Sequence, residues 1–306
     1  MSGASFDRPG RSPGDLADRL RVLPQYLLPQ QALTRLMGRL AGLHGGALTT
    51  AAVRAFVRRY GVAMAEAAEP DPAAYPSFNE FFTRALRPGA RPLADSGLVC
   101  PVDGAISQCG PIDGDLIVQA KGHRYSTTAL LGGDAALAAH FHGGSFATLY
   151  LSPRDYHRIH MPCAGRLLRM VHVPGALFSV NPLTARAVPG LFARNERVVC
   201  VFDGEGGPDG VRGPWVLVLV GATIVGSMAT AWHGVVNPPR PGVVRAWDYA
   251  DRAVRLERGA EMGRFLLGST VVLLFGRGAS GAAPAFGPGW VPGAPVRMGQ
   301  AMARCA

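Results

Sequence analysis

The sequence predicts an α+β fold, in which a mostly antiparallel β domain with a few helices follows a set of short amphipathic helices. Two observations lead to this prediction. Before residue 69, apolar residues recur every three or four positions, which is the period of a helix. After Pro92, short β-rich runs alternate with Gly, Pro and Asp-Gly turns, which is typical of antiparallel sheets.

Residues 1–14 are expected to be disordered, and Asp15–Ala68 is expected to form several short helices. Pro24, Pro29 and a group of glycines interrupt the helical pattern, and arginines flank its apolar positions. Such helices suit the surface of an anionic membrane, where each arginine contributes about 1 kcal/mol. Ordinary packing of these helices against the β domain is the alternative.

The remaining elements follow from local signals. The prolines of Pro70–Pro76 predict a linker, and Ser77 with Glu80 forms a capping box that starts a helix over Phe78–Ala85. A second helix is expected over Thr127–Phe141, and the Gly/Pro-rich tail from residue 276 to 295 is expected to be loop. Strands are expected at 99–109, 116–120, 146–151, 167–173, 197–203, 215–221 and 223–228. The chain is thereby divided into residues 1–69 and a main domain, residues 70–306.

Composition narrows the class of protein. The net charge of +10 favours a polyanionic partner, either nucleic acid or an anionic membrane, but no nucleic-acid-binding motif or aromatic-basic interleaving accompanies it. A cofactor bound to lysine is disfavoured because Lys121 is the only lysine. The five cysteines are scattered, so neither a disulfide framework nor a thiolate metal site is expected. We expect no signal peptide and no membrane-spanning segment.

One tetrapeptide, Leu267–Thr270, stands directly before the apolar run Val271–Phe275. A Gly-Ser bond at the head of a buried strand is a place where a chain can cut itself and convert the serine into a pyruvoyl group. An ordinary turn is the alternative interpretation. Three polar residues in distinctive surroundings favour the chemical interpretation, namely Asp103, His157 and His160.

Several blocks of sequence carry a resemblance to a known family. They occur in the family's order over residues 20–275, and the most specific is the Tyr-His-Arg-Ile-His-Met-Pro block at 156–162. The others are 78–82, 101–104, 121–126, 178–181, 191–197, 220–227, 263–265 and 267–270. On these blocks the chain resembles phosphatidylserine decarboxylase of the bacterial membrane-associated type.

The resemblance implies a self-cleaving enzyme. The chain would be cut between Gly268 and Ser269 into a large chain, residues 1–268, and a small chain, residues 269–306. Ser269 would attack the carbonyl of Gly268 with His160 as base and Asp103 as its carboxylate partner. Ser269 would then become the pyruvoyl cofactor, an electron sink for decarboxylation, and His157 would serve decarboxylation or return a proton.

The resemblance also implies the substrate and the setting. The reaction would convert phosphatidylserine into phosphatidylethanolamine and carbon dioxide, with Ser179 and Asn181 in the segment that positions the substrate. The enzyme would be peripheral, on the cytoplasmic face of the cell membrane and in contact with anionic phospholipid. The two cleaved chains would form a heterodimer, and two heterodimers would form a homodimer. No metal and no nucleic acid are expected.

Two other interpretations remain open. A zinc hydrolase could use His157 and His160 with Asp103 or His123 as a third ligand, although the His-x-x-His spacing differs from that of common metallopeptidases. The run Arg194–Arg197, Arg-Asn-Glu-Arg, is expected to form a structural salt-bridge turn, with a phosphate clamp as the alternative.

Overall fold

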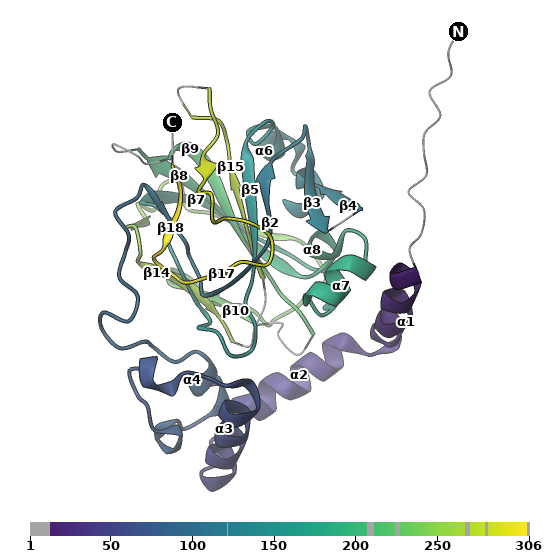
Figure 1. Cartoon of the computed structure of the whole chain (residues 1–306), viewed down its shortest axis with the longest axis vertical. Helices are drawn as coiled ribbons and strands as arrows, with labels where there is room; N and C mark the ends of the chain where they lie inside the picture. The colour runs from purple at the N-terminus through teal and green to yellow at the C-terminus, as the bar shows by residue number, and fades with distance from the viewer. Residues whose placement is uncertain are drawn as a thin grey trace.

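The computed structural model describes residues 13–120, 122–206, 211–223, 227–266, 270–278 and 281–304. Gly268, Ser269 and Lys121 lie outside these ranges. The architecture is α+β, as predicted: an antiparallel β domain carries a few short helices, and longer helices precede it (Figure 1).

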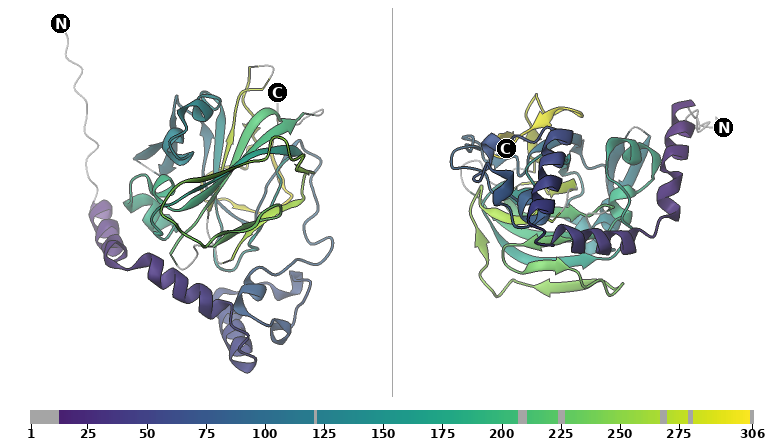
Figure 2. Two further views of the ribbon diagram at one scale, coloured as in Figure 1. Left: turned by 180° about the vertical axis from the view of Figure 1, so that it is seen from behind. Right: turned by 90° about the horizontal axis from the view of Figure 1, so that it is seen from below.

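Three helices form the N-terminal region and run along one side of the β domain (Figure 2). They are α1 (Pro13–Leu27), α2 (Gln30–Ala41) and α3 (Ala47–Tyr60). Pro24 was expected to divide the first helix, but it lies inside α1, within the turn that precedes the break at Pro29. Two 3₁₀ helices follow, η1 (Met64–Glu66) and η2 (Pro72–Ala74).

The short helices of the main domain are set by their caps. In α4 (Phe78–Phe82), Ser77 and Glu80 form the predicted capping box. The single helix expected over Thr127–Phe141 is instead two, because Gly132 and Gly133 adopt φ angles of 84° and 95°, which end a right-handed helix. These two and the remaining helices are α5 (Thr127–Leu130), α6 (Ala135–Ala139), α7 (Pro182–Ala187) and α8 (Leu191–Arg194).

A nine-stranded sheet forms the centre of the domain, and its neighbouring strands are antiparallel. Its path is β12-β7-β8-β9-β15-β5-β2-β17, and β13 pairs with β7. The strands are β2 (Gly104–Pro111), β5 (Ser145–Tyr150), β7 (Gly165–Val173), β8 (Arg197–Glu205), β9 (Arg212–Val220), β12 (Arg245–Asp248), β13 (Arg255–Leu256), β15 (Thr270–Phe275) and β17 (Pro295–Val296).

Three smaller sheets complete the fold. They have the orders β11-β10-β14-β6, β1-β18-β16 and β3-β4. Their strands are β1 (Leu98–Val99), β3 (Leu116–Ala120), β4 (His123–Ser126), β6 (Arg158–His160), β10 (Met228–Thr230), β11 (Gly234–Asn237), β14 (Glu261–Phe265), β16 (Ala285–Phe286) and β18 (Ala301–Arg304). The tail that was expected to be loop therefore contains β16 and the first residue of β17.

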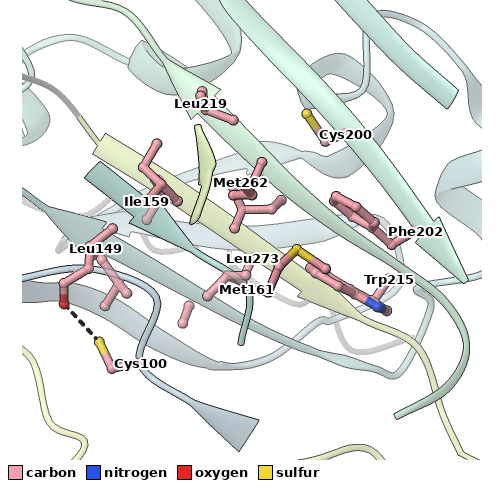
Figure 3. Close-up of a cluster of buried hydrophobic side chains, with 14 of the residues drawn as sticks. Cys100, Leu149, Ile159, Met161, Cys200, Phe202, Trp215, Leu219, Met262 and Leu273 are labelled. Carbon is pink, nitrogen blue, oxygen red and sulfur yellow. Dashed lines mark hydrogen bonds between the residues drawn. The ribbon is translucent and has the colours of Figure 1, made fainter. Parts of the chain in front are cut away.

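Both faces of the nine-stranded sheet are buried. Along β15, Val271 and Leu273 belong to one apolar cluster, while Val272 and Leu274 belong to another on the opposite face. The first cluster lies between the large sheet and strands β6, β10 and β14, and Figure 3 shows its side chains, among them Trp215. Burial on both faces holds β15 in register from its first residue, Thr270.

A third apolar cluster joins the N-terminal helices to the main domain. Val53 of α3 is fully buried with Phe81 and Phe82 of α4, and the ring of Phe56 makes edge contacts with both phenylalanines. The cluster thus contains residues from both sides of position 69. The division at that position stays a prediction.

Candidate active site

The register of the large sheet shows the edge at which β15 begins, directly after Gly268 and Ser269 in the sequence. Thr270, the first residue of β15, pairs with Tyr150 of β5 on one side and with Val220 of β9 on the other. Tyr150 in turn pairs with Ala105 of β2. Thr270 directly follows the predicted cleavage site in the sequence, so the residues just beyond these strand ends are the candidates for acting there.

Asp103 stands at this edge, directly before β2, and its side chain is held by an arginine. Its Oδ1 accepts hydrogen bonds from Nε of Arg91 at 2.9 Å and from the backbone N–H of Met298 at 2.9 Å. Its Oδ2 lies 2.5 Å from Nη2 of the same arginine. Arg91 also pairs with Glu66 at 2.7 Å, so one guanidinium serves two carboxylates. Sequence reasoning missed Arg91, which carries no local signal.

His160, at the end of β6, has both ring nitrogens engaged. Its Nδ1 lies 2.8 Å from the backbone oxygen of Gly259, which can only accept, so Nδ1 carries the proton. Its Nε2 therefore accepts from the hydroxyl of Tyr156 at 3.0 Å. Burial lowers the pKa of His160, while the hydrogen bond to Gly259 and the charges of Glu261 and, to a smaller extent, Asp103 act to raise it.

Asp103 and His160 are thus electrostatic neighbours without a direct hydrogen bond. Among the described residues, the hydrogen bonds of Asp103 come from Arg91 and Met298, and the ring of His160 bonds Gly259 and Tyr156. Tyr156 is 6% exposed, and burial raises the pKa of its hydroxyl to about 12, so it stays protonated and donates to His160. The tyrosine is a second residue that sequence reasoning did not single out.

His157 is fully buried, and its backbone contacts the end of β14. Its backbone oxygen accepts from the N–H of Phe265, the last residue of β14, at 3.2 Å. β6 follows His157 in the sequence and leads away from this contact. His160, three residues later, pairs with Glu261, so it lies about 10 Å farther along the strand at 3.3 Å per residue. The register therefore brings His157 closer than His160 to the residue where β14 ends.

The ring of His157 is stacked and neutral. It lies 4.1 Å from the ring of Phe82, and Nε2 donates to the backbone oxygen of Ser152 at 3.1 Å. Burial, aided by the charge of Arg84, lowers its pKa to about 3. Nδ1 is thus an unprotonated acceptor, and among the described residues it is buried without a hydrogen-bond partner. The hydroxyl of Thr270 is likewise buried without a partner among these residues.

The segment that contains Ser179 and Asn181 is fixed from several sides. The amide of Asn195 bonds both backbone groups of Phe178 and also donates to the backbone oxygen of Gly221 at 2.8 Å. Gly221 follows Val220, the partner of Thr270, so Asn195 ties this segment to the edge where β15 begins. Asn181 caps α7 by accepting from the N–H of Thr184, so its oxygen has a structural partner.

The expected structural salt bridge at residues 194–197 is present, but its partners lie outside the run. Glu196 is buried and pairs with His172 at 2.9 Å and with Arg240 at 2.8 Å, both distant in sequence. The guanidinium of Arg197 bonds backbone oxygens on α5 and α8. Buried charges that satisfy one another across strands leave no pattern within the turn itself.

The two histidines do not form a metal site with the third ligands proposed from sequence. Within the described ranges, no group of three or more His, Cys, Asp or Glu side chains could hold a metal ion. Asp103 is occupied by Arg91, and His123 bonds the backbone oxygen of Arg186. The zinc hydrolase alternative therefore has no support from these residues.

A polar cavity of about 350 Å³ adjoins the site. Its lining includes Asp103, Tyr156, Arg91 and Arg84. Arg84 is 5% exposed, and its Nη2 donates to the backbone oxygens of residues 154 and 155. The cavity gives small polar molecules a route to Asp103 and Tyr156 from the surface.

Comparison with known proteins places this arrangement in a family. The profile for phosphatidylserine decarboxylase matches residues 78–304, and a profile described as PSD matches residues 20–61. A phosphatidylserine decarboxylase proenzyme of Acidovorax ebreus is 69% identical over 291 residues, which cover 95% of this chain and 99% of the relative. The proenzyme of Azoarcus sp. is 68% identical, with 94% and 96% covered, and that of Verminephrobacter eiseniae is 68% identical, with 95% and 100% covered. The zinc hydrolase alternative finds no support among these relatives either.

Proposed function

The chain belongs to the phosphatidylserine decarboxylase family, and we propose that it converts phosphatidylserine into phosphatidylethanolamine and carbon dioxide. The relatives are named proenzymes, which supports a processing step before activity. The observation that supports the proposal is the sheet edge at which β15 begins: Thr270, the residue after the predicted cleavage site, pairs with Tyr150, and Tyr150 pairs with Ala105, two residues after Asp103.

We propose that self-cleavage starts when the hydroxyl of Ser269 attacks the carbonyl carbon of Gly268. His160 takes the hydroxyl proton at Nε2, its acceptor nitrogen, and Tyr156 lies within reach to relay that proton. Asp103 stabilises the positive charge that forms on His160 from a distance, as its electrostatic effect on that ring suggests. The peptide nitrogen accepts a proton as its bond to Gly268 breaks, and an ester replaces the amide.

β-Elimination then separates the two chains. The Cα of residue 269 loses a proton, the ester oxygen leaves with the carboxylate of Gly268, and dehydroalanine remains. Its enamine form isomerises, and water replaces nitrogen to give a pyruvoyl group with release of ammonia. Two buried polar atoms without a partner among the described residues, Nδ1 of His157 and the hydroxyl of Thr270, are suited to bond such a group. When formed, the pyruvoyl group supplies a ketone that withdraws electrons from the substrate.

His157 is the residue that we propose for turnover. Within the described part of the chain its Nδ1 has no hydrogen-bond partner, so it can accept a hydrogen bond from the substrate. A ring whose pKa burial lowers to about 3 gives up a proton readily, which suits a group that returns a proton to Cα after carbon dioxide leaves. Residue 179 lies in a segment that Asn195 anchors to this edge, which supports substrate positioning there.

The N-terminal helices supply the contact with the membrane in this proposal. Their exposed apolar residues include Leu27 at 84% and Leu48 at 80% exposure. No helix in the described part of the chain is long and apolar enough to cross a bilayer. We propose peripheral binding to anionic phospholipid at the cytoplasmic face, with the two cleaved chains held as a heterodimer and two heterodimers joined as a homodimer.

The test is the intact mass of purified wild-type protein and of Ser269→Ala. The wild type is expected to contain two chains, residues 1–268 and a 38-residue chain from 269 to 306 (306 − 268 = 38), whose amino terminus is blocked. Ser269→Ala is expected to give one chain without decarboxylase activity. A wild type that decarboxylates phosphatidylserine as a single unbroken chain would contradict the pyruvoyl mechanism.

A further inference from the structure

A groove of about 420 Å³ opens where α1 meets α2. It is lined by Tyr26, Leu28, Pro29, Gln30, Phe178 and Arg194, among others. Figure 1 shows α1 beside α7, so the groove lies between the N-terminal helices and the main domain. One wall, Phe178, directly precedes Ser179. The groove therefore connects the surface of the helices to the segment proposed to position the substrate.

Arg194 supplies the positive charge of the groove. Its guanidinium lies 5.3 Å from the centroid of the Phe178 ring and 5.9 Å from that of Tyr26. These two rings contact each other edge to face at 4.8 Å. Within the described ranges no carboxylate pairs with Arg194 and its side chain makes no hydrogen bond, so a guanidinium oriented by two rings keeps its donors available.

Two glutamines fix the walls of the groove. Oε1 of Gln30 accepts from the backbone N–H of Leu177 at 2.7 Å, and Oε1 of Gln25 accepts from the N–H of Ser179 at 2.9 Å. Nε2 of Gln30 also donates to the backbone oxygen of Gln25 at 2.7 Å. The break between α1 and α2 is thereby locked to the segment 177–179, so the distance between Arg194 and that segment is set in advance.

Exposed leucines occur in and near the groove. Leu28, which lines it, is 45% exposed, and Leu23 and Leu27 at the end of α1 are 56% and 84% exposed. Exposed leucines on a helix bind the acyl region of a bilayer, which brings the groove to the depth of the phosphate groups. A phosphodiester is the anion that an arginine at that depth meets, and guanidinium donors match its oxygens.

We propose that this groove binds the phosphodiester of the phosphatidylserine substrate through Arg194, with the acyl chains along Leu28 and the serine headgroup directed toward Ser179. The inference rests on the proposed function, since it names a subsite for that substrate. A phosphate clamp is the alternative that the sequence offers for residues 194–197, and this inference retains phosphate binding for Arg194 alone. The structure thus assigns to Arg194 a role in substrate affinity, separate from the residues that cut the chain.

The experiment compares wild type with Arg194→Gln and Arg194→Lys in nonionic detergent micelles, in which the mole fraction of phosphatidylserine is varied and no other anionic lipid is present. Arg194→Gln is expected to raise KM about tenfold with kcat within about twofold, because a charge-assisted hydrogen bond to the substrate is lost. Arg194→Lys keeps the charge and is expected to recover part of the loss. Arg124→Gln, an equal charge change on exposed β4, is the matched control and should keep the wild-type KM.

Two readouts keep this inference separate from the proposed function. A gel must show both chains in every variant, and the wild type must decarboxylate phosphatidylserine. A wild type that is uncut or inactive would contradict the proposed function itself. An unchanged KM in a cut and active Arg194→Gln overturns the groove assignment alone. So does a KM that changes only after phosphatidylglycerol is added, since Arg194 would then bind bystander lipid.

Discussion

Asp103 has a structural role that can be separated from its proposed chemical one. Its side chain is 10% exposed and that of Arg91 is 7% exposed, so the ion pair is largely shielded from solvent. In Asp103→Asn, one oxygen still accepts from Met298, but the charge and the second oxygen are lost. Arg91 keeps Glu66 as a partner. We therefore expect the free energy of unfolding to fall by about 2 kcal/mol, within the usual value of a hydrogen bond to a charged group.

Urea unfolding of Asp103→Asn and of the chain with Asp103 measures this loss, and both carry Ser269→Ala so that each unfolds as one chain. Arg91→Met, in the same background, is the variant matched to Asp103→Asn. It removes the cation and leaves the carboxylate of Asp103 with the N–H of Met298 alone, so we expect a loss of about 3 kcal/mol. The two variants are thus comparable in stability but differ in whether a carboxylate remains at position 103.

With Ser269 restored, the two variants should differ in self-cleavage. Asp103→Asn is expected to stay as one chain, because the negative charge that Asp103 contributes to a protonated His160 is lost. Arg91→Met is expected to be cut, since its carboxylate is still present. If Arg91→Met blocks cleavage as completely as Asp103→Asn does, the carboxylate acts through the fold alone, and the proposed triad is refuted.

Three further predictions follow from the site and the helices. His160→Ala should leave the chain uncut, whereas His157→Ala should be cut but fail in turnover; equal processing defects would mean that the two roles are divided wrongly. The pKa of His157 is about 3 when folded against 6.5 for a free histidine, so the unfolded chain binds the extra proton and stability is lost as pH falls from 6.5 toward 3. By pH 4.5 this loss reaches about 2–3 kcal/mol, and His157→Gln should show a shallower decline in urea unfolding between those pH values. Serine at Leu20, Leu27 and Leu48 should release the protein from anionic vesicles, whereas serine at the equally apolar but separate Leu93 and Leu116 should not; unchanged sedimentation of the first variant would contradict membrane binding by these helices.

Local signals predicted the elements that depend on local chemistry. The capping box at Ser77 begins α4, and the alternating run at 116–120 became β3 with the same bounds. The helix expected over Thr127–Phe141 failed because glycines with positive φ outweighed a continuous apolar pattern. The short strands β16 and β18 were missed because their pairing, and not their composition, holds them in a sheet.

The site was predicted only in part, since motifs name residues but not their partners. Asp103, His157 and His160 stood out in the sequence, yet Arg91 and Tyr156, which hold two of them, did not. The contact between Arg91 and Asp103 depends on how the chain returns to the same edge of the sheet twelve residues later. The contact between Tyr156 and His160 depends on the angle of the turn between them. The tie from Asn195 to Gly221 has the same origin, because it joins a helix end to a strand end.

The predicted cleavage site directly precedes a fully buried strand in the sequence, and this has a mechanical consequence. β15 is paired on both sides from Thr270 onward and buried on both faces, so it resists displacement when the chain is strained. Before the site, the N–H groups of Phe265 and Leu266 donate to the backbone oxygens of His157 and Ser227. If the chain is cut at the predicted bond, the distortion that an N-to-O acyl shift requires would fall on the few residues between these two anchored segments. The new chain would then begin one residue before a strand that its neighbours hold in place.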